Sequence, residues 1–182
     1  MTEDQRAPGY TVWLTGLSGA GKTTVSRLIG AELSRRGAHV EVLDGDVVRT
    51  HLSKGLGFSK EDRDTNVERI GWVASRLTLA GAAVVVAAIS PYAEARQRAR
   101  VMTEEFAQFI EVYVRASVDE CARRDPKGLY ARALAGELAD FTGVSAPYEE
   151  PVEPELVLDT ELDEPEASAD RVIALLDARG LL

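Results

Sequence analysis

The stretch Gly16–Thr23 constrains this chain more than any other part of its sequence. Its residues, GLSGAGKT, fit the pattern G-x-x-x-x-G-K-[ST] of a phosphate-binding loop at every fixed position. Residues 10–15 are rich in β-branched and aromatic side chains, which predicts a buried strand, and residues 24–36 carry apolar residues at helical spacing. A glycine-rich turn that arose by chance is the alternative, but the flanking strand and helix favour a phosphate site.

The parts of this loop have distinct roles in binding a nucleoside triphosphate. The glycines let backbone N–H groups converge on an anion, and the helix that follows adds the positive end of its dipole. Lys22 is expected to bridge the β- and γ-phosphates, and Thr23 to place its hydroxyl on Mg²⁺. The loop residues predicted to bind ATP are Gly16, Leu17, Ser18, Gly19, Ala20, Gly21, Lys22, Thr23 and Thr24.

Length and composition predict a single domain over residues 1–182, with residues 1–9 flexible. No apolar run approaches the ~20 residues of a membrane span, and the polar N-terminal stretch does not resemble a signal peptide, so we expect a cytoplasmic protein. The formal net charge of −9 argues against a general nucleic-acid binder. The one cysteine, Cys121, is expected to be a small core residue rather than a nucleophile.

Apolar patterning predicts strands that alternate with helices along the chain. The predicted strands cover residues 10–15, 38–43, 82–89, 109–114 and 156–160. The predicted helices cover residues 24–36, 47–52, 60–80, 93–105, 118–124, 129–138 and 167–179, with Ser59 as an N-cap and the charges of 93–105 mainly on a solvated face. This order is typical of a three-layer α/β fold with a mostly parallel sheet and helices on both faces. Segment 125–154, rich in glycine, proline and charge, is expected to form a mobile lid.

Ligands of such sheets bind beyond the carboxyl ends of the strands. This rule brings together the phosphate loop, the stretch 44–46, the stretch 89–91 and the segment after Val114. Asp44 and Asp46 flank a glycine at the end of a strand, where they could hold a metal or accept the proton of an acceptor hydroxyl. An Asp-Gly turn that merely joins strand to helix is the alternative interpretation.

A second group of residues could bind another anion. Arg63 and Asn66 lie three residues apart and share a helix face, and Arg49 follows the aspartates, so the three could clamp the anion together. Each of them alone is more typical of a protein surface. Phe58, in a glycine-containing loop between them, is either a core residue or a platform on which a base stacks.

A third group combines Arg123, Arg124 and Lys127 on an otherwise acidic chain. These cations are either favourable charges at the end of a helix or lid charges that close over the transferring phosphates.

Together these motifs resemble the adenylylsulfate kinases, P-loop enzymes that phosphorylate the 3′-hydroxyl of adenosine 5′-phosphosulfate (APS) with ATP. The resemblance extends from residue 12 to residue 176. It rests on the phosphate loop and on LDGD at 43–46, LGFS at 56–59, DRDTN at 62–66, ISPY at 89–92, FIEVYV at 109–114, RDPKGLY at 124–130, FTG at 141–143, PYE at 147–149 and PELVL at 154–158.

The resemblance implies a P-loop kinase fold, ATP and Mg²⁺ as cofactors, and the products ADP and 3′-phosphoadenosine 5′-phosphosulfate. It implies that Asp44 or Asp46 orients or deprotonates the 3′-hydroxyl, that Thr23 and Asp44 lie at the metal, and that Arg124 helps to bind ATP. The implied catalytic residues are Lys22, Asp44, Asp46 and Ser90. The implied APS-binding residues are Asp46, Arg49, Phe58, Arg63, Asn66, Ile89, Ser90, Lys127, Phe141 and Thr142, with the two phenylalanines sandwiching the adenine.

Ser90 matches a serine once regarded as a phosphoenzyme nucleophile in this family. No base stands beside it in the sequence, so direct in-line transfer with Ser90 as a binding residue is the favoured interpretation.

Two departures from the family pattern are evident. Val47 replaces a usual asparagine after Asp-Gly-Asp, and Thr23-Thr24 replaces the commoner Ser-Thr, which retains a hydroxyl for the metal. Val47 leaves open a kinase of another nucleotide or small hydroxyl metabolite, and a regulator that binds nucleotide without turnover is a further alternative. The resemblance also implies a homodimer that takes APS from a separate sulfate adenylyltransferase and has no nucleic-acid or membrane partner.

Overall fold

Parallel strands form the central sheet of the computed structural model, which describes residues 9–182. The strand order is β2-β3-β1-β4-β5, and every pair of neighbours is parallel, with Val12 of β1 opposite both Val85 and Ile110. The strands are β1 (Tyr10–Thr15), β2 (Val40–Asp44), β3 (Ala83–Ala87), β4 (Gln108–Arg115) and β5 (Leu156–Asp159). The expected three-layer α/β class is therefore confirmed.

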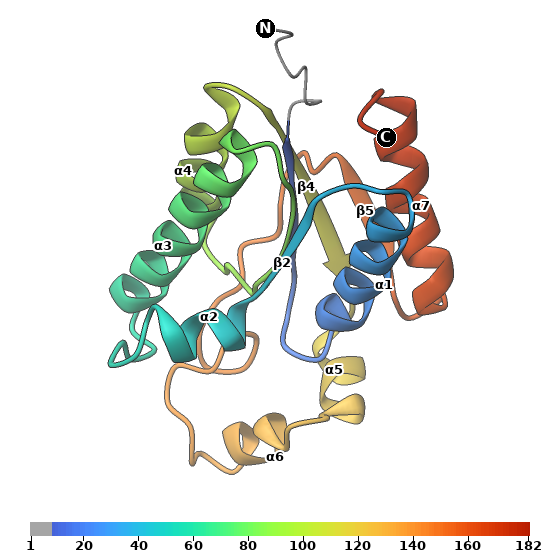
Figure 1. The fold of residues 1–182 in the computed structure, drawn as a ribbon. Coiled ribbons are helices and arrows are strands. Elements are labelled where there is room, and N and C mark those ends of the chain that lie inside the picture. Colours follow the sequence, from blue (N-terminus) through green and yellow to red (C-terminus); the bar gives the residue numbers. More distant parts are fainter. Residues whose placement is uncertain (1–8) are drawn as a thin grey trace, which may run out of the picture.

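Helices cover both faces of the sheet. The helices are α1 (Lys22–Arg35), α2 (Gly45–His51), α3 (Lys60–Leu79), α4 (Ala93–Glu104), α5 (Val118–Arg124), α6 (Leu129–Leu134) and α7 (Pro165–Ala178). Figure 1 shows α1 and α7 on one side of the sheet and α3 and α4 on the other. Helices α5 and α6 lie beyond the end of the sheet where the phosphate loop leaves β1 (Figure 1). Within residues 9–182, no helix combines the length and the apolar character needed to cross a bilayer.

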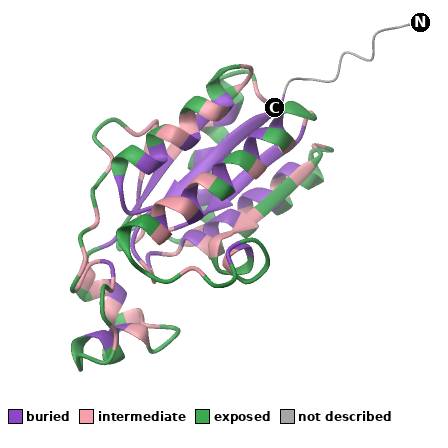
Figure 2. Cartoon of the chain, turned by 90° about the vertical axis from the view of Figure 1, so that its left-hand side faces the viewer, coloured by how far each residue is buried: buried purple, intermediate pink, exposed green. Residues whose placement is uncertain are grey.

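Two apolar clusters result from the alternation of side chains along the strands. Val12 and Leu14 of β1 face α1 and α7, where they join Ile29 and Leu176 in one cluster. Trp13, between them in sequence, points the other way and packs with Ile70 of α3 in the second cluster. Figure 2 shows the resulting buried sheet between more exposed helices.

Glycines set the distance between some of these elements. A Cβ on Gly71 of α3 would lie 2.8 Å from Cβ and 3.0 Å from Cα of Ala99 in α4, so these two helices meet at closest approach here. A Cβ on Gly30 of α1 would lie 2.8 Å from Cγ2 of Val42, which is the tip of a side chain rather than backbone.

Several predicted element boundaries differ from the observed ones, including β2, which covers 40–44 rather than 38–43, and α2, which covers 45–51 rather than 47–52. Four further differences have an identifiable reason. The strand expected over 82–89 ends at Ala87, because Ser90 takes a left-handed φ of 41° that a strand cannot hold. The helix expected over 129–138 ends at Leu134, because Gly136 takes a φ of 78° just after it. Helix α1 begins at Lys22 rather than at 24, directly after Gly21, and α7 begins at 165 rather than 167 because Pro165 suits the first helical turn.

Other local predictions hold. The Ser59 hydroxyl accepts a hydrogen bond from the backbone N–H of Asp62, as expected of an N-cap. Cys121 is fully buried, and burial raises the pKa of its thiol, which suits a core residue. The sequence predicts that residues 1–9 are flexible, and residues 1–8 lie outside the described residues.

Candidate active site

A cavity of about 1000 Å³ opens at the carboxyl ends of the strands, where the sequence predicts the site. Its walls come from the phosphate loop, the ends of β2 and β3, helix α3 and segment 125–154. The predicted site residues that line it are Ser18, Gly19, Gly21, Lys22, Thr23, Thr24, Asp44, Asp46, Arg49, Phe58, Arg63, Asn66, Ile89, Ser90, Arg124, Lys127, Phe141 and Thr142. Leu17 and Ala20 are instead buried in the core beneath the loop.

The phosphate loop takes its shape from glycines in conformations that other residues avoid. Gly19 and Gly21 have φ values of 78° and 100°. Gly16 lies so close to β4 that a Cβ there would be 2.3 Å from the carbonyl oxygen of Val114, a distance that no side chain tolerates. The loop is therefore held against the sheet with its backbone curled under the cavity.

Lys22 lies along this loop. Its Nζ donates hydrogen bonds to the carbonyl oxygens of Gly16 at 2.8 Å and Leu17 at 2.7 Å. Only 8% of the residue is exposed, and burial lowers the pKa of its ammonium group to about 8. A buried lysine ammonium at the edge of a glycine loop attracts anions strongly, because little water screens its charge.

Thr23 and Asp44 place two hard oxygens side by side at the edge of the cavity. The Thr23 hydroxyl donates to Oδ2 of Asp44 at 2.7 Å, while Oδ1 of Asp44 accepts from the N–H of Asp46 at 2.9 Å and thereby caps α2. Hydroxyl and carboxylate oxygens are ligands that Mg²⁺ accepts, and Mg²⁺ in kinases takes only one or two protein ligands beside phosphates and water. These two residues therefore fit such an ion. Within residues 9–182, no group of three or more His, Cys, Asp or Glu side chains is arranged to hold a metal ion.

Asp46 forms an ion pair with Lys127, which lies between α5 and α6. Both side chains are more than half exposed within the cavity mouth. The contact joins the end of β2 to segment 125–154 across the opening of the site.

Two arginines flank the exposed ring of Phe58. The guanidinium carbon of Arg49 lies 4.7 Å from the ring centroid and that of Arg63 lies 5.5 Å from it. Arg49 Nη1 donates to the carbonyl of Gly57 at 2.8 Å, and Arg63 donates from Nε to the carbonyl of Phe58 at 2.8 Å and from Nη2 to that of Asp140. Phe58 is 58% exposed, so the alternative of a core residue is wrong.

Asn66 and Thr142 both line the cavity and carry buried polar atoms. Asn66 is 8% exposed and Thr142 is 1% exposed, yet Oδ1 of the first and Oγ1 of the second have no hydrogen-bond partner among the described residues. Buried polar atoms are usually paired, so these two atoms are available to hydrogen-bond a ligand in the cavity.

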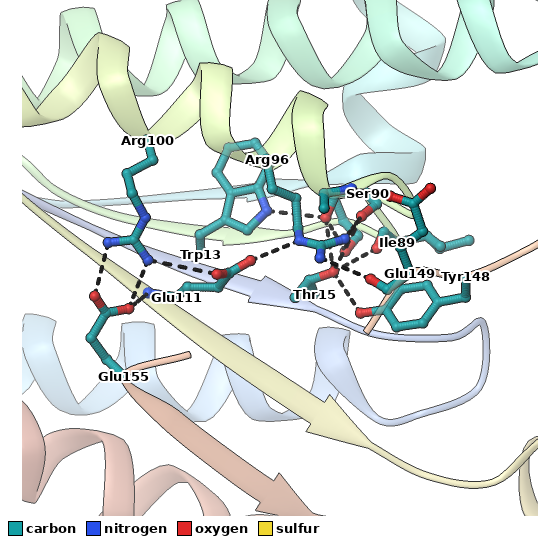
Figure 3. Close-up of polar contacts among 12 residues, drawn as sticks. Trp13, Thr15, Ile89, Ser90, Arg96, Arg100, Glu111, Tyr148, Glu149 and Glu155 are labelled. Atoms are coloured by element: carbon teal, nitrogen blue, oxygen red, sulfur yellow. Dashed lines mark hydrogen bonds and ion pairs between the residues drawn. The ribbon is translucent and has the colours of Figure 1, made fainter. Parts of the chain in front are cut away.

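The Ser90 hydroxyl points toward Trp13 and Thr15 of β1 (Figure 3). It accepts a hydrogen bond from Trp13 Nε1 at 3.1 Å and donates to Oγ1 of Thr15 at 3.0 Å. Ser90 is 2% exposed. Its hydroxyl proton is thus bound to another hydroxyl and not to a base, which is unsuited to a nucleophile.

Arg96 is an exception to the mainly solvated face that the sequence predicts for the charges of α4. Arg96 is 3% exposed and donates to Glu111, to the carbonyl of Ser90 and to the carbonyl of Glu149. An arginine can be buried in this way because each of its bonded nitrogens finds an acceptor.

Sequence reasoning missed two residues that hold the phosphate loop. Thr160, just after β5, donates from Oγ1 to the carbonyl of Ala20 at 2.8 Å, and Arg124 donates to its carbonyl. Tyr130 of α6 donates from its hydroxyl to the carbonyl of Ser18 at 3.0 Å, and its ring meets that of Phe141 edge-on at 4.9 Å between centroids. Thr160 follows a predicted strand, so the rule for carboxyl ends could have found it. Nothing in the sequence indicates the contact of Tyr130.

The sheet is parallel, a glycine loop that bears Lys22 follows its central strand, and a hydroxyl and carboxylate pair lies beside that loop in a cavity that Arg49 and Arg63 also line. These features define a P-loop kinase. The comparisons with known proteins give the family. The sequence profile described as adenylylsulphate kinase matches residues 8–159, and the chain belongs to this family.

Individual relatives agree. The chain is 52% identical to the adenylyl-sulfate kinase of Picosynechococcus sp. over 96% of this chain and 97% of that protein. It is 54% identical to that of Myxococcus xanthus over 97% and 96% of the two chains. The structure of the APS kinase of Mycobacterium tuberculosis in complex with AMPPNP and APS superposes with a TM-score of 0.90 at 44% identity, covering 93% of this chain and 98% of that one.

Proposed function

We propose that this protein transfers the γ-phosphoryl group of ATP to the 3′-hydroxyl of APS, and that the cavity residues divide this work as follows. The reaction yields ADP and 3′-phosphoadenosine 5′-phosphosulfate. The observation that carries the proposal is that one cavity contains both the phosphate loop and the Arg49, Phe58 and Arg63 pocket, with Asp44 and Asp46 between them. Two nucleotides can therefore meet over the carboxylates.

ATP would occupy the side of the cavity built by the phosphate loop. Lys22 would exchange the two loop carbonyls for phosphate oxygens and stabilise the charge of the transferring group. Thr23 and Asp44 would hold Mg²⁺, which when bound neutralises charge on the phosphates. Arg124, fixed by Thr160 at the edge of the loop, would contribute a further positive charge on this side.

APS would occupy the side built by α2 and α3. Phe58 and Phe141 would hold its adenine between them, and Arg49 and Arg63 would bind its anionic phosphosulfate. The unpaired oxygens of Asn66 and Thr142 support polar contacts to this nucleotide. Ile89 and Ser90 would form the wall behind it.

The transfer itself would be a direct in-line displacement. The 3′-oxygen of APS forms a bond to the γ-phosphorus while the bond from that phosphorus to the β,γ-bridging oxygen breaks, and ADP leaves. Asp46 is the better placed of the two aspartates to accept the hydroxyl proton, because Asp44 already accepts from Thr23 and caps α2.

Segment 125–154 would act as a lid. Its α6 portion projects from the body of the protein (Figure 2). Lys127 would exchange Asp46 for the anionic groups of the bound nucleotides, and Phe141 would close over the adenine. Closure of this kind excludes water from the transferring phosphoryl group.

The proposal is tested by an assay that couples ADP release to a measurable signal. The purified protein is supplied with ATP, Mg²⁺ and APS, and separately with other nucleotides and small alcohols. ADP release that depends on APS supports the proposal. Release that depends on another acceptor, or tight nucleotide binding without turnover, would refute the assignment of APS.

We further propose that the protein works in the cytoplasm, where ATP is available, on APS made by a separate sulfate adenylyltransferase. We also propose a homodimer, which the exposed Trp72 and Leu79 on one helix support. Light scattering after size-exclusion chromatography measures the mass in solution, and a mass of one chain would refute the dimer.

A further inference from the structure

Ser90 has a backbone conformation that residues with a side chain disfavour. Its φ of 41° lies in the left-handed region that glycine enters far more readily. Such conformations persist only where the surrounding contacts enforce them. Ser90 and Ile89 both line the cavity at the end of β3. The contacts that enforce this turn therefore also fix one wall of the site.

One set of contacts comes from β1 (Figure 3). Thr15 Oγ1 donates to the carbonyl of Ile89 at 2.7 Å, and it accepts from the hydroxyls of Ser90 at 3.0 Å and Tyr148 at 2.8 Å. One donor and two acceptor positions are all that a hydroxyl has. The Thr15 hydroxyl is thus fully used, and it determines where the Ile89 carbonyl and the Ser90 side chain lie.

The second set of contacts comes from Arg96 (Figure 3). Its Nη1 donates to the carbonyl of Ser90 at 2.8 Å, Nη2 donates to the carbonyl of Glu149 at 2.8 Å, and Nε donates to Oε1 of Glu111 at 2.7 Å. These acceptors lie on three separate segments. A planar guanidinium can reach all three at once, whereas an ammonium group cannot keep this geometry.

Glu149 extends the contact to the returning end of segment 125–154. Its backbone N–H donates to the carbonyl of Pro91 at 2.8 Å, and its carboxylate accepts from the N–H of Ala93 at 2.7 Å at the start of α4. Arg96 therefore joins the turn at Ser90 to the point where this segment returns to the body of the protein.

Arg96 is itself held by a chain of charges across β4 (Figure 3). Glu111 lies 3.6 Å from Arg100, and Arg100 forms a bidentate pair with Glu155 at 2.8 and 2.9 Å. Glu155 also accepts from the backbone N–H of Glu111 at 2.6 Å. Because these groups are largely buried and mutually paired, the Arg96 guanidinium has little freedom to move.

We propose that Arg96 is a positioning residue for acceptor binding: it enforces the left-handed turn at Ser90 and thereby sets the Ile89–Ser90 wall of the APS pocket. The inference rests on the proposed function, in which the Ile89–Ser90 wall contacts the acceptor APS. Arg96 lies behind the wall and acts through Ser90 and Ile89. Its loss should therefore weaken the binding of the acceptor and leave the phosphate loop unaffected, because the hydrogen bonds of Arg96 go to Ser90, Glu111 and Glu149 and not to that loop.

The first test replaces Arg96 by lysine, which keeps the charge beside Glu111 and loses the three-way contact. We expect the KM for APS to rise about tenfold or more, as the loss of hydrogen bonds from a charged group predicts, and the KM for ATP to stay within about twofold of wild type. The matched control is Arg98→Lys on the same helix, whose side chain is 34% exposed and pairs with Glu94 at 2.8 Å and with Glu68 of α3 at 2.6 Å, so that the control loses ion-pair geometry away from the turn at Ser90. Neither KM should change in this control by more than about twofold.

A second test approaches the same turn from β1, in case Arg96→Lys does not fold. Thr15→Val removes the hydroxyl that holds Ile89 and Ser90, whereas Thr15→Ser retains it. We expect the valine variant to raise the KM for APS about tenfold and the serine variant to stay near wild type. In a Ser90→Gly background, where glycine adopts the turn without strain, Arg96→Lys should raise the KM for APS by a smaller factor than in wild type.

The proposal is overturned if Arg96→Lys and Thr15→Val leave the KM for APS unchanged, or if they raise both KM values equally. It is also overturned if the effect of Arg96→Lys is undiminished in the Ser90→Gly background. Failure of the proposed function appears separately, because the wild-type protein would then turn over another acceptor. The same variants would be compared on that acceptor.

Discussion

The hydroxyl of Thr23 lies 2.7 Å from a carboxylate oxygen of Asp44, although the two residues belong to different βα units. The pair joins the first turn of α1 to the end of β2 and faces the cavity that also contains the phosphate loop. The relationship separates the two aspartates by their contacts. Asp44 accepts from Thr23 at the end of the loop, whereas Asp46 pairs with Lys127.

Asp44→Asn should lower kcat about 100-fold and raise the Mg²⁺ concentration needed for half-maximal rate, because an amide is a weaker ligand than a carboxylate. Asparagine still caps α2, so the free energy of unfolding should change by less than about 0.5 kcal/mol. The comparison is Asp46→Asn, which should lower kcat and leave the Mg²⁺ dependence as it is. Magnesium titrations of both variants measure this, and equal shifts in the two would show that the roles are not separate.

Lys22 predicts a basic limb in the pH profile. Burial lowers the pKa of its ammonium group to about 8, so the free enzyme loses this charge as the pH rises through that value. We expect kcat/KM for ATP to fall on the alkaline side of this pKa, since the neutral amine no longer attracts phosphate. Bound phosphates favour the charged form of Lys22, so the alkaline decline of kcat should begin at a higher pH than the decline of kcat/KM. Profiles of both constants at saturating APS check this, and coincident limbs would argue against it.

Tyr130 predicts a separable effect on the two substrates. Burial raises the pKa of its hydroxyl, which therefore stays protonated and donates to the carbonyl of Ser18 in the phosphate loop. Tyr130→Phe removes this bond, worth about 1 kcal/mol, and should raise the KM for ATP about fivefold. The ring contact with Phe141 survives, so the KM for APS should hold. Tyr130→Leu loses both contacts and should raise both constants, and an unchanged KM for ATP in the phenylalanine variant would refute the prediction.

Two glycines in helices should respond to alanine with different outcomes. Gly71→Ala gains about 1 kcal/mol of helix propensity but forces α3 away from α4, and overpacking of this kind costs about 1–3 kcal/mol, so the variant should be destabilised. Gly30→Ala makes the same gain, and its one close contact is with Cγ2 of Val42, a residue that is 37% exposed and whose side chain can rotate. The free energy of unfolding of the Gly30→Ala variant should therefore equal or exceed that of the wild-type protein. Urea unfolding of both variants measures the difference, and equal destabilisation would contradict this account of the two contacts.

The features that the sequence predicts well are those written in short stretches. The phosphate loop, the alternation of strands and helices and the N-cap at Ser59 each depend on a few neighbouring residues. The gathering of the phosphate loop, Asp44 and Ile89 at one edge follows from a single rule about parallel sheets. These parts of the fold and of the candidate site are predictable because local propensity and topology agree.

The features that the sequence does not reveal depend on contacts between distant segments. Arg96 sits in a helix of alternating charges, and only the approach of Ser90, Glu111 and Glu149 makes it a buried residue. The ion pair between Asp46 and Lys127 spans 81 residues. The turn at Ser90 contradicts its local preference, so no propensity could have predicted where β3 ends.

The indole of Trp13 gives the protein a built-in optical reporter. Trp13 is fully buried and donates to the Ser90 hydroxyl, whereas the other tryptophan, Trp72, is 60% exposed on α3. In a Trp72→Phe protein, all tryptophan fluorescence would arise from a ring bonded to the wall of the acceptor pocket. Its emission can then follow nucleotide binding in real time without an attached dye.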